Sequence, residues 1–475
     1  MSNRKKNTFT FLFYDYETFG THPALDKPNQ FSCIRTDIDF NIIETSKTLF
    51  CYPPLDYLPN PESILVTGIT PQYTYLNGLN EFYFARNIYN ILSVRNTCII
   101  GYNNINFDDE ITRNIFYRNF IDPYDWSWRN GNSRWDVLSI LRAYYALRPY
   151  GINWLSNSDG FPSFKLEDMS KANNISHRLS HNALSDVYAT IELVKLLKFK
   201  QPKLFNFLLK NKNKQMVLNI INNKILSPIF YITGFFGTKR NNISLITPFV
   251  LHPKNHNIFI CFDLNKDITN LIKFVHDSNS IILDFNLFFS VGILFIHVNK
   301  CPILAPLNCL SNYEMNRLGI NYSYCIKNLN VLRKQQHVLY KIKLLLDNNV
   351  YNSSTTNDID LRIYESFFCN NDKKNIKLIS KKLPLNCNIN SISFYDKKIN
   401  DILFRCKARN FPYFLTHYEK QKWLKHCHQV LHPIKIDNYK VKIKKFLMQN
   451  KHNKKNIFLL KSILLYLKEL EIYIG

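Results

Sequence analysis

The chain has 475 residues, more than one hydrophobic core usually serves, so its length predicts two or three domains. Hydrophobic residues make up 46% of the chain and aromatic residues 15%, a composition that excludes a disordered protein. A formal net charge of +25, from 61 Lys and Arg against 36 Asp and Glu, favours a polyanionic partner such as a nucleic acid. The abundance of Lys, Asn, Ile, Phe and Tyr is also typical of an AT-rich genome, so the charge is weak support for that partner.

The cysteines and the apolar runs indicate the cellular compartment in which the protein is expected. Eleven cysteines are scattered without any C-x-x-C pair, which predicts reduced thiols and no zinc ribbon. The local cluster His426-Cys427-His428 is expected to lie along a helix rather than to bind a metal. The start of the chain lacks an apolar signal segment, and the longest apolar run, residues 287–298, is too short to span a bilayer. We interpret that run as one or two core strands and expect a soluble, cytoplasmic protein.

Taken in chain order, residues 8–200 alternate apolar strand-like runs with helical periodicity, which predicts an α/β layer fold. Residues 201–225 have helical spacing and are rich in Lys and Asn. The next segments predict strands of a small, mainly β domain: "PIFYITGFFGTKRNN", "NHNIFICFDL" and "VGILFIHVNKCPIL". A polar connector follows at residues 349–360. The remaining stretches predict amphipathic helices: "IYESFF", "DILFRCKARNF", "QKWLKHCHQVLH" and "KSILLYLKELEIYI".

The first buried strand carries two acids. In "FLFYDYETFG", residues 11–20, side chains alternate with period two, so Asp15 and Glu17 point to one side while Tyr14 and Tyr16 point to the other. A solvated strand end is the simplest interpretation. The apolar residues before the acids, however, predict a strand buried on both faces, and sites in open α/β sheets gather at the carboxyl ends of such strands. A divalent metal site is therefore a live hypothesis.

A third acid, Asp108, follows the strand-like "CIIGYN" just where a helical pattern begins. Helix capping is the ordinary role for Asp at such a position.

A fourth acid lies in "SHNALSDVYATIELVKLL", where His181 stands five residues before Asp186. Five residues correspond to roughly 140° of helix rotation, so the two side chains would not share a face if both were inside a helix. We therefore expect His181 at or before the first turn, with Ser180 as the candidate cap and Asp186 inside the helix. A lone His near a helix start is more often structural than catalytic.

The order of these features carries more weight than any one of them. A D-x-E on a first strand, an Asp after a later strand and an H-x4-D opening a helix resemble the DEDDh class of 3′ to 5′ exonucleases, which have a ribonuclease H-like fold. The longer stretches resemble the bacterial exodeoxyribonuclease I family: "FLFYDYETFGTHPALDKPNQF", "VTGITPQ", "GYNNINFDDEITRNIFYRNFIDPYDWSW", "NSRWDVL", "LRPYGINW" and "KARNFP". The resemblance covers essentially the whole chain and is densest up to about residue 200.

This resemblance implies an α/β fold with three domains. They would be a ribonuclease H-like exonuclease domain (8–200), a small Src-homology-3-like β-barrel domain (201–352) and a helical domain (356–475) that completes a DNA clamp. The implied activity is a monomeric exodeoxyribonuclease that releases 5′-mononucleotides from the 3′ end of single-stranded DNA, in DNA repair and recombination.

The resemblance also assigns the chemistry. Two divalent ions, Mg²⁺ with Mn²⁺ as an alternative, would be held by four acids: Asp15, Glu17, Asp108 and Asp186. His181 would be the general base for the attacking water, and these five residues make up the catalytic set. The assignment is chemically reasonable because hard cations prefer carboxylate oxygens and a neutral imidazole can accept a proton near pH 7.

The implied DNA-binding residues mix aromatic and basic side chains, as single-strand binding requires. They are Glu17, Thr18, Phe19, Leu65, Arg113, Tyr124, Trp128, Arg142 and Lys165. Without the resemblance, aromatic residues at such spacing are more often part of a core. Lys165 offers a point charge where the family more often has Arg.

The family also binds the acidic C-terminal tail of single-stranded DNA-binding protein, for which Arg148 and Arg317 are candidates. Two other functions stay open. One is a ribonuclease of the same fold, since the residues do not settle the choice between DNA and RNA. The other is a non-catalytic single-strand binder, which the presence of all five catalytic-type residues disfavours. A proofreading subunit is disfavoured because two further domains follow the nuclease domain.

Overall fold

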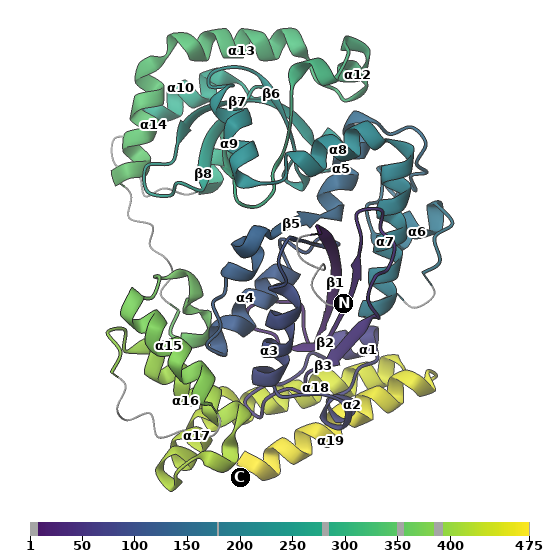
Figure 1. Ribbon diagram of the computed structural model, residues 1–475, viewed down its shortest axis with the longest axis vertical. Coiled ribbons are helices and arrows are strands. Elements are labelled where there is room, and N and C mark those ends of the chain that lie inside the picture. Colours follow the sequence, from purple (N-terminus) through teal and green to yellow (C-terminus); the bar gives the residue numbers. More distant parts are fainter. Residues whose placement is uncertain (1–7, 178–179, 278–284, 349–355, 384–392, 475) are drawn as a thin grey trace, which may run out of the picture. The chain divides into compact units, whose positions relative to one another are not determined.

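The computed structural model describes residues 8–177, 180–277, 285–348, 356–383 and 393–474 (Figure 1). The chain forms two compact units. Unit 1 contains Met1–Ser133, His177–Tyr188 and Ser353–Gly475, and unit 2 contains Arg134–Ser176 and Ala189–Asn352. Most of the predicted connector at 349–360 lies outside the described residues.

The first sheet confirms the α/β prediction. Its strand order is β3-β2-β1-β4-β5. The strands are β1 (Thr10–Thr18), β2 (Pro28–Thr36), β3 (Lys47–Phe50), β4 (Thr97–Gly101) and β5 (Ser133–Asp136), and the chain passes from unit 1 to unit 2 within β5. β1 runs antiparallel to β2 and parallel to β4. The apolar part of β1, Phe11 to Tyr14, is buried on both faces, as its uninterrupted apolar run predicts.

Four helices of unit 1 accompany these strands: α1 (Pro61–Thr67), α2 (Pro71–Asn77), α3 (Glu81–Leu92) and α4 (Asp108–Arg118). The first three begin at side-chain caps, Asn60, Thr70 and Asn80, each of which accepts a bond from a backbone N–H of its helix. One face of β1 packs against α3 and α4 through a core that includes Tyr14, Tyr16, Phe84, Ile88 and Ile115.

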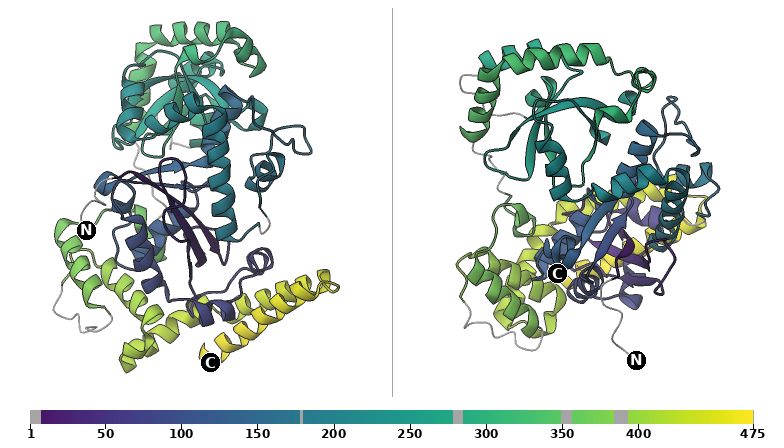
Figure 2. Two further views of the ribbon diagram at one scale, coloured as in Figure 1. Left: turned by 45° about the vertical axis from the view of Figure 1, so that its right-hand side comes forward. Right: turned by 45° about the horizontal axis from the view of Figure 1, so that its top comes forward.

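The C-terminal residues of unit 1 are helical: a 3₁₀ turn (Ile359–Tyr364), α15 (Asn370–Lys382), α16 (Lys398–Asn410), α17 (His417–Val430), α18 (Pro433–Gln449) and α19 (Lys454–Ile474). The last two lie side by side, and α19 also contacts α1 and α2 (Figures 1 and 2). Three predicted helices are confirmed as parts of α16, α17 and α19. The helix predicted over 363–368 is wrong, because the 3₁₀ turn ends at Tyr364 after burying Ile359 and Ile363, and α15 begins only at Asn370.

The His426-Cys427-His428 cluster lies on α17, as expected. Cys427 is buried in a core cluster, and His426 Nε2 lies 3.2 Å from Asp56 Oδ2.

Unit 2 contains an antiparallel sheet with strand order β10-β6-β7-β8-β9. Its strands are β6 (Ile229–Ile232), β7 (Ile243–Leu251), β8 (Ile258–Asp263), β9 (Ile293–His297) and β10 (Ile303–Ala305). The helices before this sheet are α5 (Val137–Leu147), α6 (Leu166–Ala172), α7 (Ala183–Lys200, which starts in unit 1), α8 (Pro202–Lys210) and α9 (Lys214–Asn222). α9 covers one face of the sheet, where Val217 and Ile221 pack against Ile229 and Ile246 (Figure 1).

Two expectations for this region need correction. The middle third is more helical than predicted, since it also contains α10 (Ile268–Asp277), α11 (Phe285–Ser290), α12 (Asn312–Arg317), α13 (Tyr322–Lys334) and α14 (Gln336–Asn348). The prediction for the apolar run at 287–298 is right only in part, because the run contains one strand, β9, preceded by the end of α11. Gly292 lies between them with φ +94°, a backbone conformation that ends the helix and that other residues rarely adopt. In the described part of the chain, no helix has the length and apolar character that a bilayer span needs.

Candidate active site

The carboxyl end of β1 carries the two acids as the alternation predicts. β1 pairs with β4 only from Thr10 to Phe13, so the strand continues beyond that point without this neighbour. Asp15 and Glu17 lie past the end of the pairing, opposite Ser32 and Gln30 of β2. The side chains of the two acids therefore share a face at an open edge of the sheet, while the tyrosines between them lie in the core.

Asp108 lies beside this open edge. It begins α4, and its Oδ1 accepts a hydrogen bond from the backbone N–H of Tyr16 at 3.0 Å. The Asp108 carboxylate thus accepts a hydrogen bond from a backbone N–H of β1 that has no partner on β4. An ordinary helix cap would bond only to its own helix. Two more bonds hold the start of α4 against β1: Tyr14 donates to Asp109 Oδ1 at 2.5 Å, and the Tyr16 and Thr112 hydroxyls lie 3.0 Å apart.

Asp186 lies in the first turn of α7, as predicted, and His181 precedes the helix with φ +62°. Ser180 is not the cap. Asn182 takes that role, because its Oδ1 accepts from Ser185 N at 3.3 Å. The helix start is also tied to β2, since Ala183 N donates to Gln30 Oε1 at 3.3 Å. These bonds bring the first turn of α7 to the same end of the sheet as the β1 acids.

Three carboxylates meet at this point. Oxygen atoms of Asp15, Glu17 and Asp186 all lie within 4.8 Å of one another. Asp108 is not part of this close group, but its charge acts on Asp15. The fold therefore brings together the acids that the resemblance implies, three of them in a tight cluster and the fourth beside it.

The electrostatics of the cluster reflect crowded, partly buried negative charge. Burial and then the Asp186 carboxylate raise the pKa of Glu17 to about 8. Burial and then the neighbouring carboxylates, Asp108 first, raise the pKa of Asp15 well above its ordinary range. Burial likewise raises the pKa of Asp108, although the N–H of Tyr16 partly offsets this effect. Acids in such surroundings are stabilised as anions when a cation lies among them.

The donor set fits a divalent metal ion. Carboxylate oxygens are hard ligands, and three of them at this spacing could bind one ion jointly, with Asp108 available for a second. Apart from this group, the described residues contain no set of three or more His, Cys, Asp or Glu side chains close enough to share an ion.

A histidine that the sequence did not single out contacts this cluster. His177 Nε2 lies 2.6 Å from Asp186 Oδ1, and its side chain is only 5% exposed. Burial raises the pKa of Asp186, and the hydrogen bond from His177 partly offsets this effect. His181, the histidine that the resemblance implies as general base, is exposed. The sequence offered one signal for His177, namely that it lies on the same α6–α7 connection as His181.

The implied strand-binding residues nearest the acids differ in exposure. Thr18 is buried and its hydroxyl donates to the Gly20 carbonyl oxygen. Phe19 is fully buried in a core cluster with Ile64 and residues of α18 and α19, and Leu65 is partly buried against the same cluster.

Arg113, Tyr124 and Trp128 lie on or after α4. Arg113 is buried, with Nη1 2.6 Å from Glu110 Oε1 and its guanidinium 5.7 Å from the centre of the Tyr124 ring. Trp128 is 63% exposed. The sequence did not single out Tyr364 and Phe367, yet Tyr364 bonds to Glu110 and Arg113, and Phe367 packs edge-on against Tyr124.

The other candidates lie in unit 2. The Arg142 guanidinium packs against Gly234, where a Cβ atom would come within 2.6 Å of its Cζ. Lys165 is exposed and directly precedes α6. Arg148 and Arg317 are neighbours, since Arg148 Nη1 lies 3.5 Å from Glu314 Oε1 and Arg317 donates to Ala146 O at 2.7 Å.

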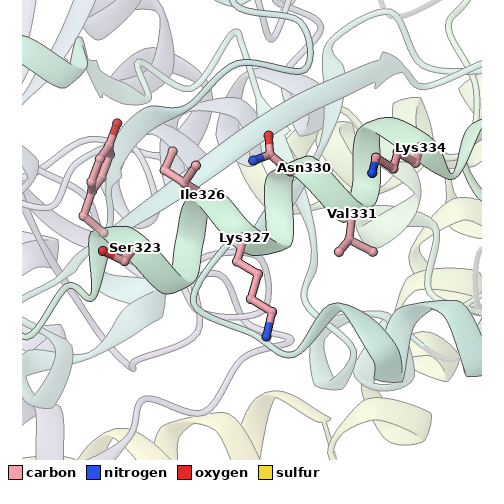
Figure 3. Close-up of a pocket in the computed structure, with 7 residues that line it drawn as sticks. Ser323, Ile326, Lys327, Asn330, Val331 and Lys334 are labelled. Carbon is pink, nitrogen blue, oxygen red and sulfur yellow. The ribbon is translucent and has the colours of Figure 1, made fainter.

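A surface pocket of unit 2 offers no comparable chemistry. It lies along α13 and is lined by Tyr322, Ser323, Ile326, Lys327, Asn330, Val331 and Lys334 (Figure 3). The residues that line it include no carboxylate and no histidine.

Comparison with known proteins finds similarity along most of the chain. Residues 12–194 match the family model described as Exonuclease, residues 212–348 the Exonuclease I SH3-like domain, and residues 357–470 the Exonuclease I C-terminal domain. A relative, the exodeoxyribonuclease I of Buchnera aphidicola subsp. Baizongia pistaciae (strain Bp), is 48% identical over 472 residues, which cover 98% of this chain and 97% of the relative.

Two solved structures are also similar. The zinc-bound form of an E. coli ExoI–ssDNA complex has a TM-score of 0.90 and 42% identity, covering 98% of this chain and 100% of the other. An ExoI/SSB-Ct complex has the same TM-score, identity and coverage, 0.90, 42%, 98% and 100%. With three matching domain families and a relative of nearly equal length that is 48% identical, this chain belongs to the exodeoxyribonuclease I family.

Proposed function

We propose that this protein removes 5′-mononucleotides from the 3′ end of single-stranded DNA by metal-assisted phosphodiester hydrolysis. The observation that carries the proposal is the meeting of Asp15, Glu17 and Asp186 within 4.8 Å at the carboxyl end of β1. The ssDNA in the complex of the E. coli relative supports the choice of substrate.

In this mechanism, Asp15, Glu17, Asp108 and Asp186 would hold two Mg²⁺ ions, with Mn²⁺ as the alternative. When bound, such ions supply charge stabilisation to the attacking and leaving oxygens of an in-line displacement. His181 would accept the proton of the attacking water. Its position outside α7 and its exposure leave the imidazole free to reach a substrate at the cluster.

The aromatic and basic residues that the resemblance implies would hold the strand. Glu17, Thr18, Phe19 and Leu65 would border the terminal nucleotide. Arg113, Tyr124, Trp128, Arg142 and Lys165 would contact the nucleotides behind it through stacking and phosphate charge. The exposure of Trp128 supports a stacking role for its ring.

The remaining assignments follow from the family. We propose exonuclease (8–200), Src-homology-3-like (201–352) and helical (356–475) domains, a monomeric state and a cytoplasmic location. The C-terminal tail of single-stranded DNA-binding protein would bind at Arg148 and Arg317. Their proximity supports a shared anion site, as does the SSB-Ct complex of the relative.

The test is digestion of a 5′-labelled single-stranded DNA oligonucleotide with Mg²⁺, beside an EDTA control, a blunt duplex and an RNA of the same sequence. Asp186→Asn should lower the cleavage rate at least about 10³-fold, since metal assistance is worth several kcal/mol, while DNA binding is retained. The matched control is Glu192→Gln, an exposed acid farther along α7.

A magnesium-dependent ladder that shortens from the 3′ end, with the duplex spared, is the expected result. Equal cleavage by Asp186→Asn would refute the metal assignment, and faster cleavage of the RNA would favour a ribonuclease. DNA binding without any shortening would leave a non-catalytic single-strand binder.

A further inference from the structure

The connection between α6 and α7 brings two histidines to the acid cluster, and they are placed differently. His177 makes a direct side-chain contact, 2.6 Å from its Nε2 to Asp186 Oδ1. His181 lies at the surface in a left-handed backbone conformation, φ +62°.

The environment of His177 is that of a positioning group. Its side chain is 5% exposed, so it is nearly withdrawn from solvent. Its Nδ1 is buried and has no hydrogen-bond partner among the described residues, which leaves the bond to Asp186 as the polar contact that orients the ring. Burying a polar ring is unfavourable unless the ring is hydrogen-bonded, so burial of His177 favours its hydrogen bond to Asp186.

Asp186 needs such support when its neighbours are ionised, because they then repel it. Asp15 and Glu17 approach its carboxylate within 4.8 Å, and like charges favour rotation of the side chain away from the cluster. The backbone of Asp186 is held by the helix start, where Asp186 N donates to Asn182 O at 3.0 Å, but that bond leaves the side-chain rotamer open. A hydrogen bond from the ring N–H of His177 restricts the side-chain rotamer of Asp186, and His177 lies outside the group of three carboxylates.

We infer that His177 is a positioning residue for metal binding, which donates its Nε2–H to Asp186 and so keeps that carboxylate directed at the Asp15–Glu17 pair. This inference rests on the proposed function, in which Asp186 is a metal ligand. A carboxylate has about four lone-pair sites, so one bond to His177 leaves capacity for a cation. The bond needs only a ring N–H, which both the neutral and the charged imidazole can supply. Outer partners of metal ligands typically contribute 10- to 100-fold to metal affinity.

The experiment is calorimetric titration of Mn²⁺ into the DNA-free, EDTA-treated and dialysed full chain. His177→Ala should weaken Mn²⁺ binding by about 10- to 100-fold. His177→Gln, whose side-chain amide can donate a similar bond, should recover most of that affinity. His452→Ala, an exposed histidine between α18 and α19, is the matched control. Cleavage by His177→Ala should rise toward the wild-type rate as Mn²⁺ is raised, whereas His181→Ala should stay slow at saturating Mn²⁺.

Thermal melting in EDTA checks that each variant is folded. Wild-type or tighter Mn²⁺ binding by His177→Ala would overturn the inference, as would equal weakening in folded His177→Ala and His177→Gln. Asp186→Asn separates the two proposals. If Asp186→Asn loses Mn²⁺ binding while His177→Ala does not, only the positioning role fails. If Asp186→Asn binds Mn²⁺ like the wild type, the proposed metal site fails too.

Discussion

The acidic side chains at the end of β1 lie so close together that their negative charges repel one another, and a bound metal ion would reduce this repulsion. Asp15, Glu17 and Asp186 are brought together by the strand, its neighbour β2 and the start of α7, and not by attraction among themselves. The close approach of these acids therefore lowers the stability of the metal-free folded chain, as is common at functional sites. Burial and the neighbouring carboxylates raise the pKa values of Asp15 and Glu17.

This cost predicts a pH dependence of stability. The pKa of Glu17 is raised from an ordinary 4.5 to about 8, so the metal-free folded chain keeps a proton that the unfolded chain releases above pH 4.5. The contribution of this Glu17 proton to the free energy of unfolding is therefore complete at low pH and is lost as the pH rises through about 8. Urea unfolding in EDTA should show a lower free energy of unfolding at pH 8 than at pH 6.

Mg²⁺ should restore stability most strongly at the high end of this range, because it binds the ionised carboxylates of the folded state. Glu17→Gln should flatten the pH dependence, since the amide does not titrate. An unchanged slope in Glu17→Gln would show that other groups cause the effect.

Among the elements, α16 has a role that the "KARNFP" segment did not reveal. Arg409 on this helix lies 2.7 Å from both Asp56 Oδ2 and Asp360 Oδ2, and all three side chains are nearly fully buried. Although burial acts in the opposite direction, Arg409 holds the pKa values of both carboxyls below their ordinary range. The next residue, Asn410, accepts from Phe82 N at 3.0 Å. This segment of the family pattern thus joins the C-terminal helices to the exonuclease part of unit 1.

Arg409→Ala should be strongly destabilising, by about 3–5 kcal/mol, because it leaves two buried carboxylates without a shared partner. Lys422→Ala is the matched control, since the Lys422–Asp401 pair is 3.9 Å apart and half exposed, and should cost about 0–1 kcal/mol. Urea unfolding of the full chain, followed by tryptophan fluorescence, measures both. A cost for Arg409→Ala no larger than that of Lys422→Ala would contradict the proposed joining role.

For the molecule as a whole, the net charge of +25 becomes meaningful once the family is known. Composition alone did not separate function from genome bias. A nuclease that must hold a polyanion without reading its sequence, however, benefits from a broadly positive surface.

Binding of single-stranded DNA should therefore weaken steeply with salt, with a log–log slope of about −0.7 for each phosphate neutralised. Fluorescence anisotropy with a labelled oligonucleotide in EDTA, from 50 to 200 mM salt, measures the slope without cleavage. Lys165→Ala should make the slope shallower by about 0.7, whereas Trp128→Ala should cost about 1–3 kcal/mol of affinity with the slope unchanged. A slope near zero for the wild type would contradict electrostatic binding.

Much of the site followed from local rules. The period-two alternation of β1 placed Asp15 and Glu17 on one face, and helix geometry placed His181 before α7 with Asp186 inside it. The family pattern added Asp108. The amphipathic patterns likewise located α16, α17 and α19, because side-chain periodicity is a property of the segment alone.

Contacts between distant segments required the folded chain. Arg409 and Asp56 are 353 residues apart, and no local periodicity relates them. The bond of Asp108 to Tyr16 N depends on where β4 stops pairing with β1, and the bond of His177 to Asp186 joins a residue before α7 to one inside it. Local patterns specify which way a side chain points from its own strand or helix. Which oxygen or nitrogen it meets is set by packing with other segments, and that is where the chemistry of this site resides.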